Sequence, residues 1–138
     1  MLEARRREPE MSLEVLGPRA CRRLLDHVSV AWLAHCDDGA VHMVPVNFAV
    51  HGTEIVIHSA YGRSLTAVVE GRLLTVAAGD FDEETRTGWS VTVTGRAHLV
   101  GDPLVNPGAP AAEVWADLPS TVPVAVAMTE VTGRRVRR

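Results

Sequence analysis

Several hallmarks of common functional classes are missing from this 138-residue sequence. It contains no lysine, and its net charge of −3 gives no general attraction to nucleic acid or to anionic lipid. No apolar run reaches the roughly 18 residues that span a bilayer, and the start lacks the apolar segment of a signal peptide. We therefore expect a cytoplasmic protein with no nucleic-acid partner and no membrane partner.

Closely spaced cysteine pairs and the glycine-rich motifs of nucleotide-binding proteins are also missing. Cys21 and Cys36 lack the Cys-x-x-Cys spacing of a metal or redox site, so we interpret them as reduced thiols. Neither a Walker pattern nor the glycine-rich first turn of a dinucleotide-binding fold occurs. The six histidines do not show the paired spacing that is typical of zinc sites. The arginines gather near the two ends, where such runs are typical of solvated tails.

The length and the hydrophobic content of 46% fit one folded domain. Residues 1–10 are charged and poor in apolar side chains, which predicts a loosely ordered tail before a domain over residues 11–138. The first predicted element of that domain is a helix from Pro18 to His27. Pro18 suits a first helical turn, and the apolar residues that follow recur on one face.

Six segments have the composition or the alternation of β-strands. Between the first two, Asp38-Gly39 predicts a tight hairpin turn, because this pair tolerates positive φ angles. In the second strand Pro45 cannot donate a hydrogen bond, which predicts an edge or bulge where the main chain faces a ligand. In the fifth strand Gly95 permits a kink. The predicted strands are Val30–Cys36, Val41–Val50, Glu54–Ser59, Leu73–Ala78, Trp89–Arg96 and Val122–Met128.

Between the strands, the polar stretch Gly79–Gly88 and the Pro- and Gly-rich stretch Gly101–Pro110 are expected to be loops, and Ala111–Leu118 a short helix. Strands outnumber helices and no βαβ alternation is present. The sequence therefore predicts a mainly β fold, a six-stranded antiparallel Greek-key β-barrel with two or three small flanking helices.

A candidate phosphate-binding loop follows the third strand. Ser64 can cap a helix that the apolar spacing after it suggests, so a strand runs into a helix through a small loop. Ser59 and Ser64 supply hydroxyls, and Arg63 supplies paired donors that match phosphate oxygens. We interpret the loop as a phosphate cradle. An ordinary strand-to-helix turn with a solvated Arg63 remains the alternative.

Four segments in this order resemble the pyridoxamine 5′-phosphate oxidase-like family of flavin-binding split barrels, in particular its small single-domain members. They are Val44-Pro45-Val46-Asn47-Phe48, His58-Ser59-Ala60-Tyr61-Gly62-Arg63-Ser64, the stretch Thr87–Ala97 that begins Thr-Gly-Trp-Ser-Val, and Val131-Thr132-Gly133-Arg134-Arg135. The resemblance extends from about Arg19 to Arg135. It implies a split barrel, and a homodimer with two FMN sites at the interface, each built from both subunits.

The resemblance also implies a place for each part of the cofactor. The backbone around Pro45, Val46, Asn47 and Phe48 would lie along the isoalloxazine ring. Ser59, Arg63 and Ser64 would hold the phosphate, and His58 and Ala60 would line the ribityl path. Trp89 and Ser90 would reach the flavin from the partner chain. On its position in an alternating strand alone, Trp89 is equally consistent with a core or interface anchor.

The implied function is that of an FMN-dependent oxidoreductase with an unknown small-molecule substrate, passing electrons between a reduced nicotinamide and a small acceptor. No catalytic side chain and no metal ligand is assigned. The C-terminal segment Gly133–Arg138 offers arginine but no histidine, so vitamin B6 oxidase activity is not expected. Three alternatives stay open: binding of the deazaflavin F420, binding of haem, and a flavin-binding or sensing module without turnover.

Overall fold

The computed structural model describes residues 11–59, 71–100 and 122–138. In this part of the chain there are eight strands and one helix. No helix among them has the length and apolar character needed to cross a membrane. The elements are β1 (Ser12–Leu16), α1 (Pro18–Leu25), β2 (Val30–Asp37), β3 (Ala40–His51), β4 (Glu54–Ser59), β5 (Leu73–Asp82), β6 (Thr87–Leu99), β7 (Val122–Ala127) and β8 (Glu130–Arg137).

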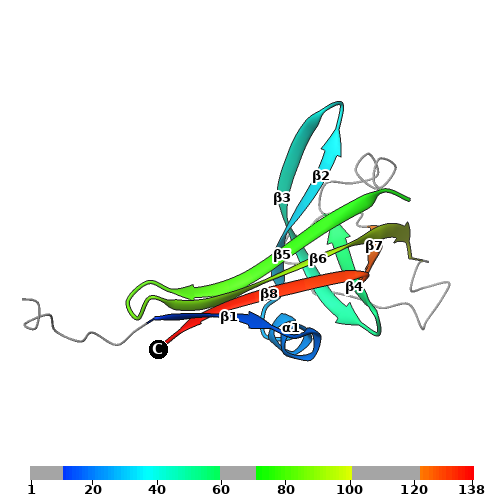
Figure 1. Ribbon diagram of the computed structural model, residues 1–138. Coiled ribbons are helices and arrows are strands. Elements are labelled where there is room, and N and C mark those ends of the chain that lie inside the picture. The colour runs from blue at the N-terminus through cyan, green and yellow to red at the C-terminus, as the bar shows by residue number, and fades with distance from the viewer. Residues whose placement is uncertain (1–10, 60–70, 101–121) are drawn as a thin grey trace, which may run out of the picture.

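Six of the strands close into a barrel (Figure 1). Their order is β6-β5-β2-β3-β4-β7, every pairing is antiparallel, and β7 returns to pair with β6. The remaining two strands, β8 and then β1, extend the sheet from β6 outside this ring. The predicted six-stranded antiparallel barrel is therefore confirmed.

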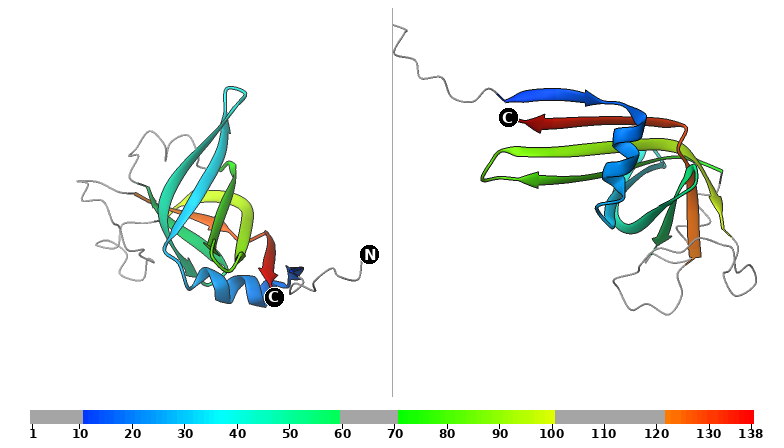
Figure 2. Two further views of the ribbon diagram at one scale, coloured as in Figure 1. Left: turned by 90° about the vertical axis from the view of Figure 1, so that its left-hand side faces the viewer. Right: turned by 90° about the horizontal axis from the view of Figure 1, so that it is seen from below.

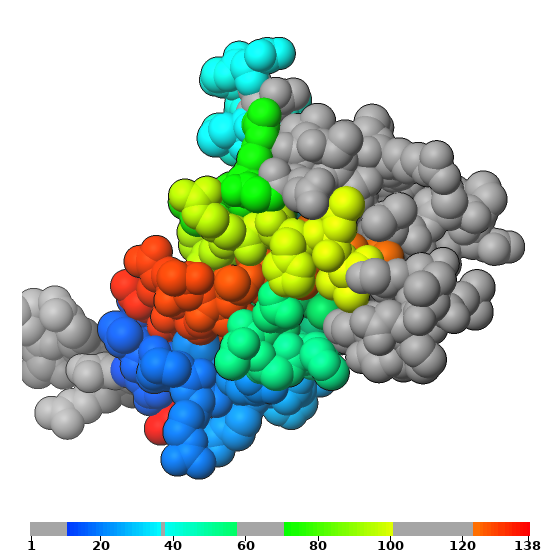
Figure 3. All heavy atoms as spheres, turned by 90° about the vertical axis from the view of Figure 1, so that its right-hand side faces the viewer, coloured from blue at the N-terminus to red at the C-terminus, as the bar shows by residue number. Residues whose placement is uncertain are grey.

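Beyond the barrel, the outer ends of β5, β6 and β8 continue together with β1 as a long four-stranded sheet, which we call the arm (Figure 1). The β2–β3 hairpin leaves the barrel separately, and it stands out in cyan at the top of Figure 3. Helix α1 lies across the sheet where the arm joins the barrel, packed against β8, β6 and β3 (Figure 2).

Alternation along the strands places the core inside the barrel. In β6, for example, Val91 and Val93 are fully buried, whereas the side chains on either side of them are half-buried on the opposite face. Helix α1 buries Cys21, Leu24 and Leu25 against the same core. We call the side of the sheet turned away from this core the outer face.

Two sequence predictions about local structure are confirmed. The hairpin turn has positive φ at both central residues, 49° at Asp38 and 76° at Gly39, as a tight hairpin requires. The predicted helix is present, although α1 ends at Leu25 with Asp26 as its C-cap rather than extending to His27. The helices expected after Ser64 and at Ala111–Leu118, and the tail at residues 1–10, lie outside the described residues.

Two other predictions are wrong. The basic C-terminal segment is not a tail but strand β8, because it pairs with β6 on one edge and with β1 on the other. Strand β1 was not predicted either, and an ion pair of 2.7 Å between Arg137 Nε and Glu14 Oε1 links the two strands.

The loop predicted over Gly79–Gly88 is only a short turn, because β5 continues to Asp82. The Oδ1 of Asp82 accepts hydrogen bonds from the backbone N–H groups of Glu84 and Thr85 in this turn.

Gly95 lies where β6 changes partners. The edge of β6 that pairs with β8 from Gly88 to Thr94 pairs with β7 from Ala97 onward. At this change the backbones come so close that a Cβ on Gly95 would lie 1.7 Å from the carbonyl oxygen of Ala127. Closure of the barrel therefore requires glycine at this position.

We expect Gly95→Ser to lower the free energy of unfolding by about 3 kcal/mol, the upper end of the usual range for overpacking, because the contacted atom belongs to the backbone and cannot rotate away. Chemical denaturation of the purified variant measures this. The matched control is Gly17→Ser, because an added Cβ there meets nothing within 4 Å and Ser is a favoured N-cap residue. Equal stability of the two variants would contradict this account of the closure.

An ion pair also links β6 to β4 across β7. His98 Nε2 contacts Glu54 Oε2, and this hydrogen bond raises the pKa of His98 above its usual value, whereas partial desolvation acts in the opposite direction. The His98 side chain is 54% exposed, so water screens the pair and limits its contribution to below about 1 kcal/mol.

The pH dependence of this contribution has a definite sign. Because the folded-state pKa is raised, the stabilisation is fully present below the unfolded pKa of about 6.5 and is lost as the pH rises through the folded pKa. We expect His98→Gln to cost more stability at pH 5.5 than at pH 9, measured by thermal unfolding. In a Glu54→Gln background, His98→Gln should lower the stability by the same amount at both pH values. If the loss of stability still differed between the two pH values, Glu54 would be excluded as the cause.

Candidate functional site

Strand β3 has an open main-chain edge at Pro45. It pairs with β2 from Ala40 to Asn47, but its pairing with β4 begins only at Asn47. Among the described strands, none covers the β4-side edge of β3 from Ala40 to Val46. The edge predicted at Pro45 is therefore confirmed, since no strand in the described part of the chain pairs with it.

The side chains of this segment divide between the two faces of the sheet. Val46 and Phe48 are buried in the core, whereas Pro45 is exposed and Asn47 is half-buried on the outer face. The Nδ2 of Asn47 donates to the carbonyl oxygen of Ser29 at 3.2 Å, and the backbone N–H of Phe48 donates to the same oxygen at 3.1 Å. A ligand on the outer face would thus meet Pro45, Asn47 and main chain, but not the side chains of Val46 and Phe48.

A groove of about 390 Å³ lies on the outer face directly beside this segment. It is within the range of about 300–1,000 Å³ that is typical of small-molecule sites. Its position follows from the register, because Val30 pairs with Asn47 and Trp32 pairs with Pro45. We call it the outer-face groove; it is lined by Val30, Trp32, Ala77, Ala78, Gly79, Phe81 and Ser90.

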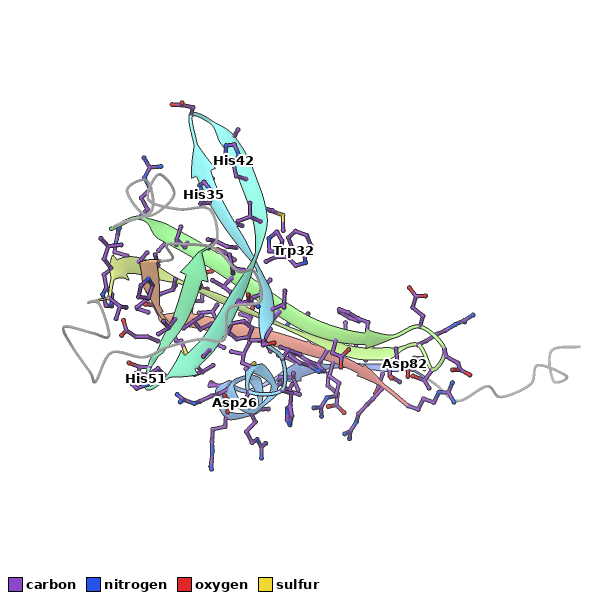
Figure 4. The ribbon with its side chains drawn as sticks, turned by 180° about the vertical axis from the view of Figure 1, so that it is seen from behind. Asp26, Trp32, His35, His42, His51 and Asp82 are labelled. Atoms are coloured by element: carbon purple, nitrogen blue, oxygen red, sulfur yellow. The ribbon has the colours of Figure 1, made fainter. Side chains whose placement is uncertain are left out.

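The outer-face groove brings together residues from three strands. Trp32 lies at the base of the projecting hairpin (Figure 4), and across the sheet it pairs with Ala77 of β5, whose neighbours in turn pair with β6. Ser90 reaches the groove because it pairs with Gly79. Of the predicted site residues, Pro45, Asn47 and Ser90 therefore share one region of the outer face.

Trp89 and Ser90 point to opposite faces of β6. Trp89 is half-buried and packs against the hydrophobic core, while Ser90 lines the outer-face groove. This placement favours the interpretation of Trp89 as a core anchor. Its contact with a flavin bound by a partner chain stays a prediction.

The described part of the candidate phosphate cradle is strand β4. Its residue His58 pairs with Asn47, and Ser59 is its last residue. Ala60, Arg63 and Ser64 lie outside the described residues. The register therefore brings the beginning of the candidate cradle beside Asn47, at the border of the open edge of β3.

The other candidate groups form no metal site among the described residues. His35 and His42 are a cross-strand pair on the β2–β3 hairpin with stacked rings, their centroids 5.2 Å apart (Figure 4). Both cysteines are free thiols, in agreement with the sequence analysis. Cys21 is buried, and desolvation raises the pKa of its thiol, whereas Cys36 is exposed.

Comparison with known proteins supports the resemblance of the four sequence segments to a known family. The sequence profile of the family described as pyridoxamine 5′-phosphate oxidase matches residues 18–135. The chain belongs to the pyridoxamine 5′-phosphate oxidase-like family. Among curated proteins, none matches this member of the family at a significant level.

Solved structures similar to this pyridoxamine 5′-phosphate oxidase-like chain share its split-barrel fold. The FAD binding protein from Mycobacterium smegmatis is 28% identical, with a TM-score of 0.70 over 91% of this chain and 100% of its own. An FAD-binding protein from Mesorhizobium loti is 20% identical, with a TM-score of 0.73 over 94% and 100%. The FAD and heme binding protein from M. smegmatis is 18% identical, with a TM-score of 0.65 over 91% and 72%.

Sequence reasoning missed the two aromatic residues of the outer-face groove in this family member. Trp32 was one residue of an apolar run, and Phe81 fell in a stretch predicted to be a polar loop. The signal that could have found Phe81 is its position between Gly79 and Gly88, since glycines in a strand often leave room for a neighbouring ring or ligand.

Proposed function

We propose that this chain binds a flavin and acts as an oxidoreductase on a small molecule. The isoalloxazine ring would lie on the outer face along Pro45 and Asn47, and the phosphate at the cradle of Ser59, Arg63 and Ser64. The observation that carries the proposal is that Ser90 lines the outer-face groove, while Pro45 and Asn47 pair with its lining residues Trp32 and Val30. The similar M. smegmatis structure, named an FAD binding protein, adds support.

The residues present fit a flat, largely apolar ring that carries polar atoms on one edge. Pro45 is exposed and lacks an N–H, so the surface next to it is apolar, while the main chain beside it, with which β4 does not pair, offers hydrogen-bonding groups. A bound flavin would supply hydride and electron transfer, with a reduced nicotinamide as the proposed donor. The role of the chain is to hold the ring and, through main-chain groups near it, to adjust its electron affinity.

We propose FMN as the specific cofactor, because the family resemblance implies FMN and the sequence of the candidate cradle offers one arginine and two hydroxyls for a phosphate group. The names of the similar structures make FAD the second candidate, since both M. smegmatis proteins and the M. loti protein are named for FAD. The two cofactors differ by an adenylate group, so the mass of the released molecule separates them.

We further propose that a second copy of the chain covers the outer face and completes the site. Large apolar side chains gather there from four strands, and their exposed fractions run from 51% at Trp32 to 75% at Val15. Monomeric proteins rarely expose a contiguous apolar patch of this kind. The family resemblance implies a homodimer, and this face fits it; its exposed residues are Leu13, Val15, Trp32, Val41, Met43, Leu73 and Phe81.

The first prediction concerns the cofactor. We expect the purified protein to show a two-band flavin absorption spectrum, and Arg63→Ala to weaken FMN binding by roughly 1.5–3 kcal/mol, because a charged phosphate contact is lost. Titration of the apoprotein with FMN measures this loss, and mass analysis identifies the native cofactor. Arg19→Ala is the matched control, since Arg19 is exposed on α1 away from the outer face.

Three results would contradict parts of this proposal. Unchanged FMN affinity in Arg63→Ala would exclude the cradle. Tighter binding of F420 than of FMN would replace the cofactor, and a bound flavin that no nicotinamide reduces would leave a binding module without turnover.

The second prediction concerns the dimer. We expect Leu13→Glu to produce monomers in analytical ultracentrifugation, because the dimer interface would bury two unpaired carboxylates. The stability of the folded monomer should not change, because Leu13 is exposed in it. Leu99→Glu is the matched control: Leu99 is also exposed and apolar, but it lies at the far end of β6 from the arm. A Leu13→Glu variant that stays dimeric would place the interface elsewhere.

A further inference from the structure

Strand β8 carries two opposite charges on the outer face, which is the face on which we place the dimer interface. Glu130 pairs with Thr94 and Arg134 pairs with Ser90, and both charged side chains are exposed. They lie four residues apart, about 13 Å at the usual rise of a strand, with Thr132 between them. This separation is too large for the two charges of one chain to form an ion pair with each other.

Neither charge has an oppositely charged partner among the described residues. The ion pairs found there join β8 to β1 on the other face and β6 to β4. Arg134 Nη1 donates to the carbonyl oxygen of Gly133 at 3.3 Å. Arg96, which lies diagonally across from Glu130, donates to the carbonyl oxygen of Gly71 at 3.0 Å. A partner subunit that covers this face must therefore bring an opposite charge to each, because an unpaired charge is costly to bury.

A line of paired residues crosses the outer face at Thr132. We call this line the central row; from β3 to β8 its residues are Pro45, Trp32, Ala77, Thr92 and Thr132. Arg134 and Glu130 lie at equal distances on either side of the central row. On β5, Phe81 and Leu73 do the same, with exposed fractions of 66% and 60%. Complementary side chains are thus placed symmetrically about one line on two different strands.

We propose that the two-fold axis of the homodimer runs along the central row, between the outer faces of the two subunits, and that Arg134 forms an ion pair with Glu130 of the partner subunit. Rotation about this axis turns β8 antiparallel over β8 of the partner, so the dimer contains this ion pair twice. Two sheets packed face to face lie about 10 Å apart, a gap that an arginine and a glutamate can bridge together. The inference rests on the dimer of the proposed function.

Other axes that align the two copies of β8 do not join opposite charges. An axis that crosses β8 at Arg134 or at Glu130 sets that residue against its own copy, and an axis along β8 does so for both. Like charges that face each other across an interface weaken it. An axis at Val131 or at Gly133 leaves both charges unpaired. The position at Thr132 is therefore the one that the charges of β8 favour.

The same axis leaves the outer-face groove open between the subunits. Rotation about the central row sets Val30 of the groove against Ala34 of the partner subunit, and Gly79 against Thr75 of the partner subunit. Because these facing side chains are small, they cover the groove without filling it. The groove becomes a slot enclosed by both subunits, as a ligand site shared between them requires.

The test reverses one charge at a time and then mixes the two variants. In Arg134→Glu, and likewise in Glu130→Arg, both contacts of the dimer join like charges. We expect the dissociation constant of the dimer to rise about a hundredfold in each variant, measured by analytical ultracentrifugation. Mixed in equal amounts, the two variants should form a heterodimer with an affinity close to that of the wild type, because each contact again joins opposite charges. Native mass spectrometry identifies the heterodimer by its mass.

Arg19→Glu is the matched control for Arg134→Glu. It makes the same change of charge on the exposed side of α1, away from the outer face, so the dissociation constant of the dimer should stay unchanged. Glu130 and Arg134 are both exposed, so neither reversal opens a cavity in the core or endangers folding.

Three results would overturn the inference. They are an unchanged dissociation constant in both single variants, weakening in only one of them, and failure of the mixed variants to form the heterodimer. Dimers that Leu13→Glu breaks but that neither charge reversal weakens contradict only the position of the axis. A monomeric wild-type protein contradicts the proposed dimer and the axis together, and its flavin content, measured by absorption, decides the cofactor proposal separately.

Discussion

The close approach of β6 and β7 at Gly95 is the constraint on which the rest of the structure depends. On one edge β6 pairs with β5 throughout, and on the other it pairs first with β8 and then with β7. The same strand is therefore part of the arm at one end and part of the closed barrel at the other. Without a glycine where the partners change, the backbone of Ala127 could not come near enough for β7 to close the ring.

Because the barrel is closed, its outer face is the surface on which strands far apart in sequence are brought together. The hydrophobic core lies inside the ring, so it contributes nothing to binding beyond holding β2, β5 and β6 in register. That register brings Trp32, Phe81 and Ser90 around one groove beside the open edge of β3. The cofactor and the partner subunit that we propose would both use this face, which fits the many apolar side chains exposed on it.

Local pattern was enough to predict the barrel strands and the Asp38-Gly39 turn, because alternation and turn chemistry act over a few residues. It was not enough for β1 and β8. The arginines of β8 look solvated when read alone, and only pairing with β6 and β1 makes them a strand. The open edge at Pro45 was predictable from the missing N–H of proline. The groove was not, because its geometry depends on the register between Trp32 and Ala77, which no local signal fixes.

The pairing of β1 with β8 also affects how the molecule folds. Ser12 donates its hydroxyl to the carbonyl oxygen of Arg137, a residue 125 positions away in sequence. To form a contact between residues so far apart in sequence, the chain must first lose loop-closure entropy, and only the completed contact is stabilising. Chains rich in such contacts therefore fold slowly. The edge of the arm is thus expected to form late. Until it does, β8 presents unpaired backbone beside an apolar face, so early association of chains competes with folding, and the balance shifts with protein concentration.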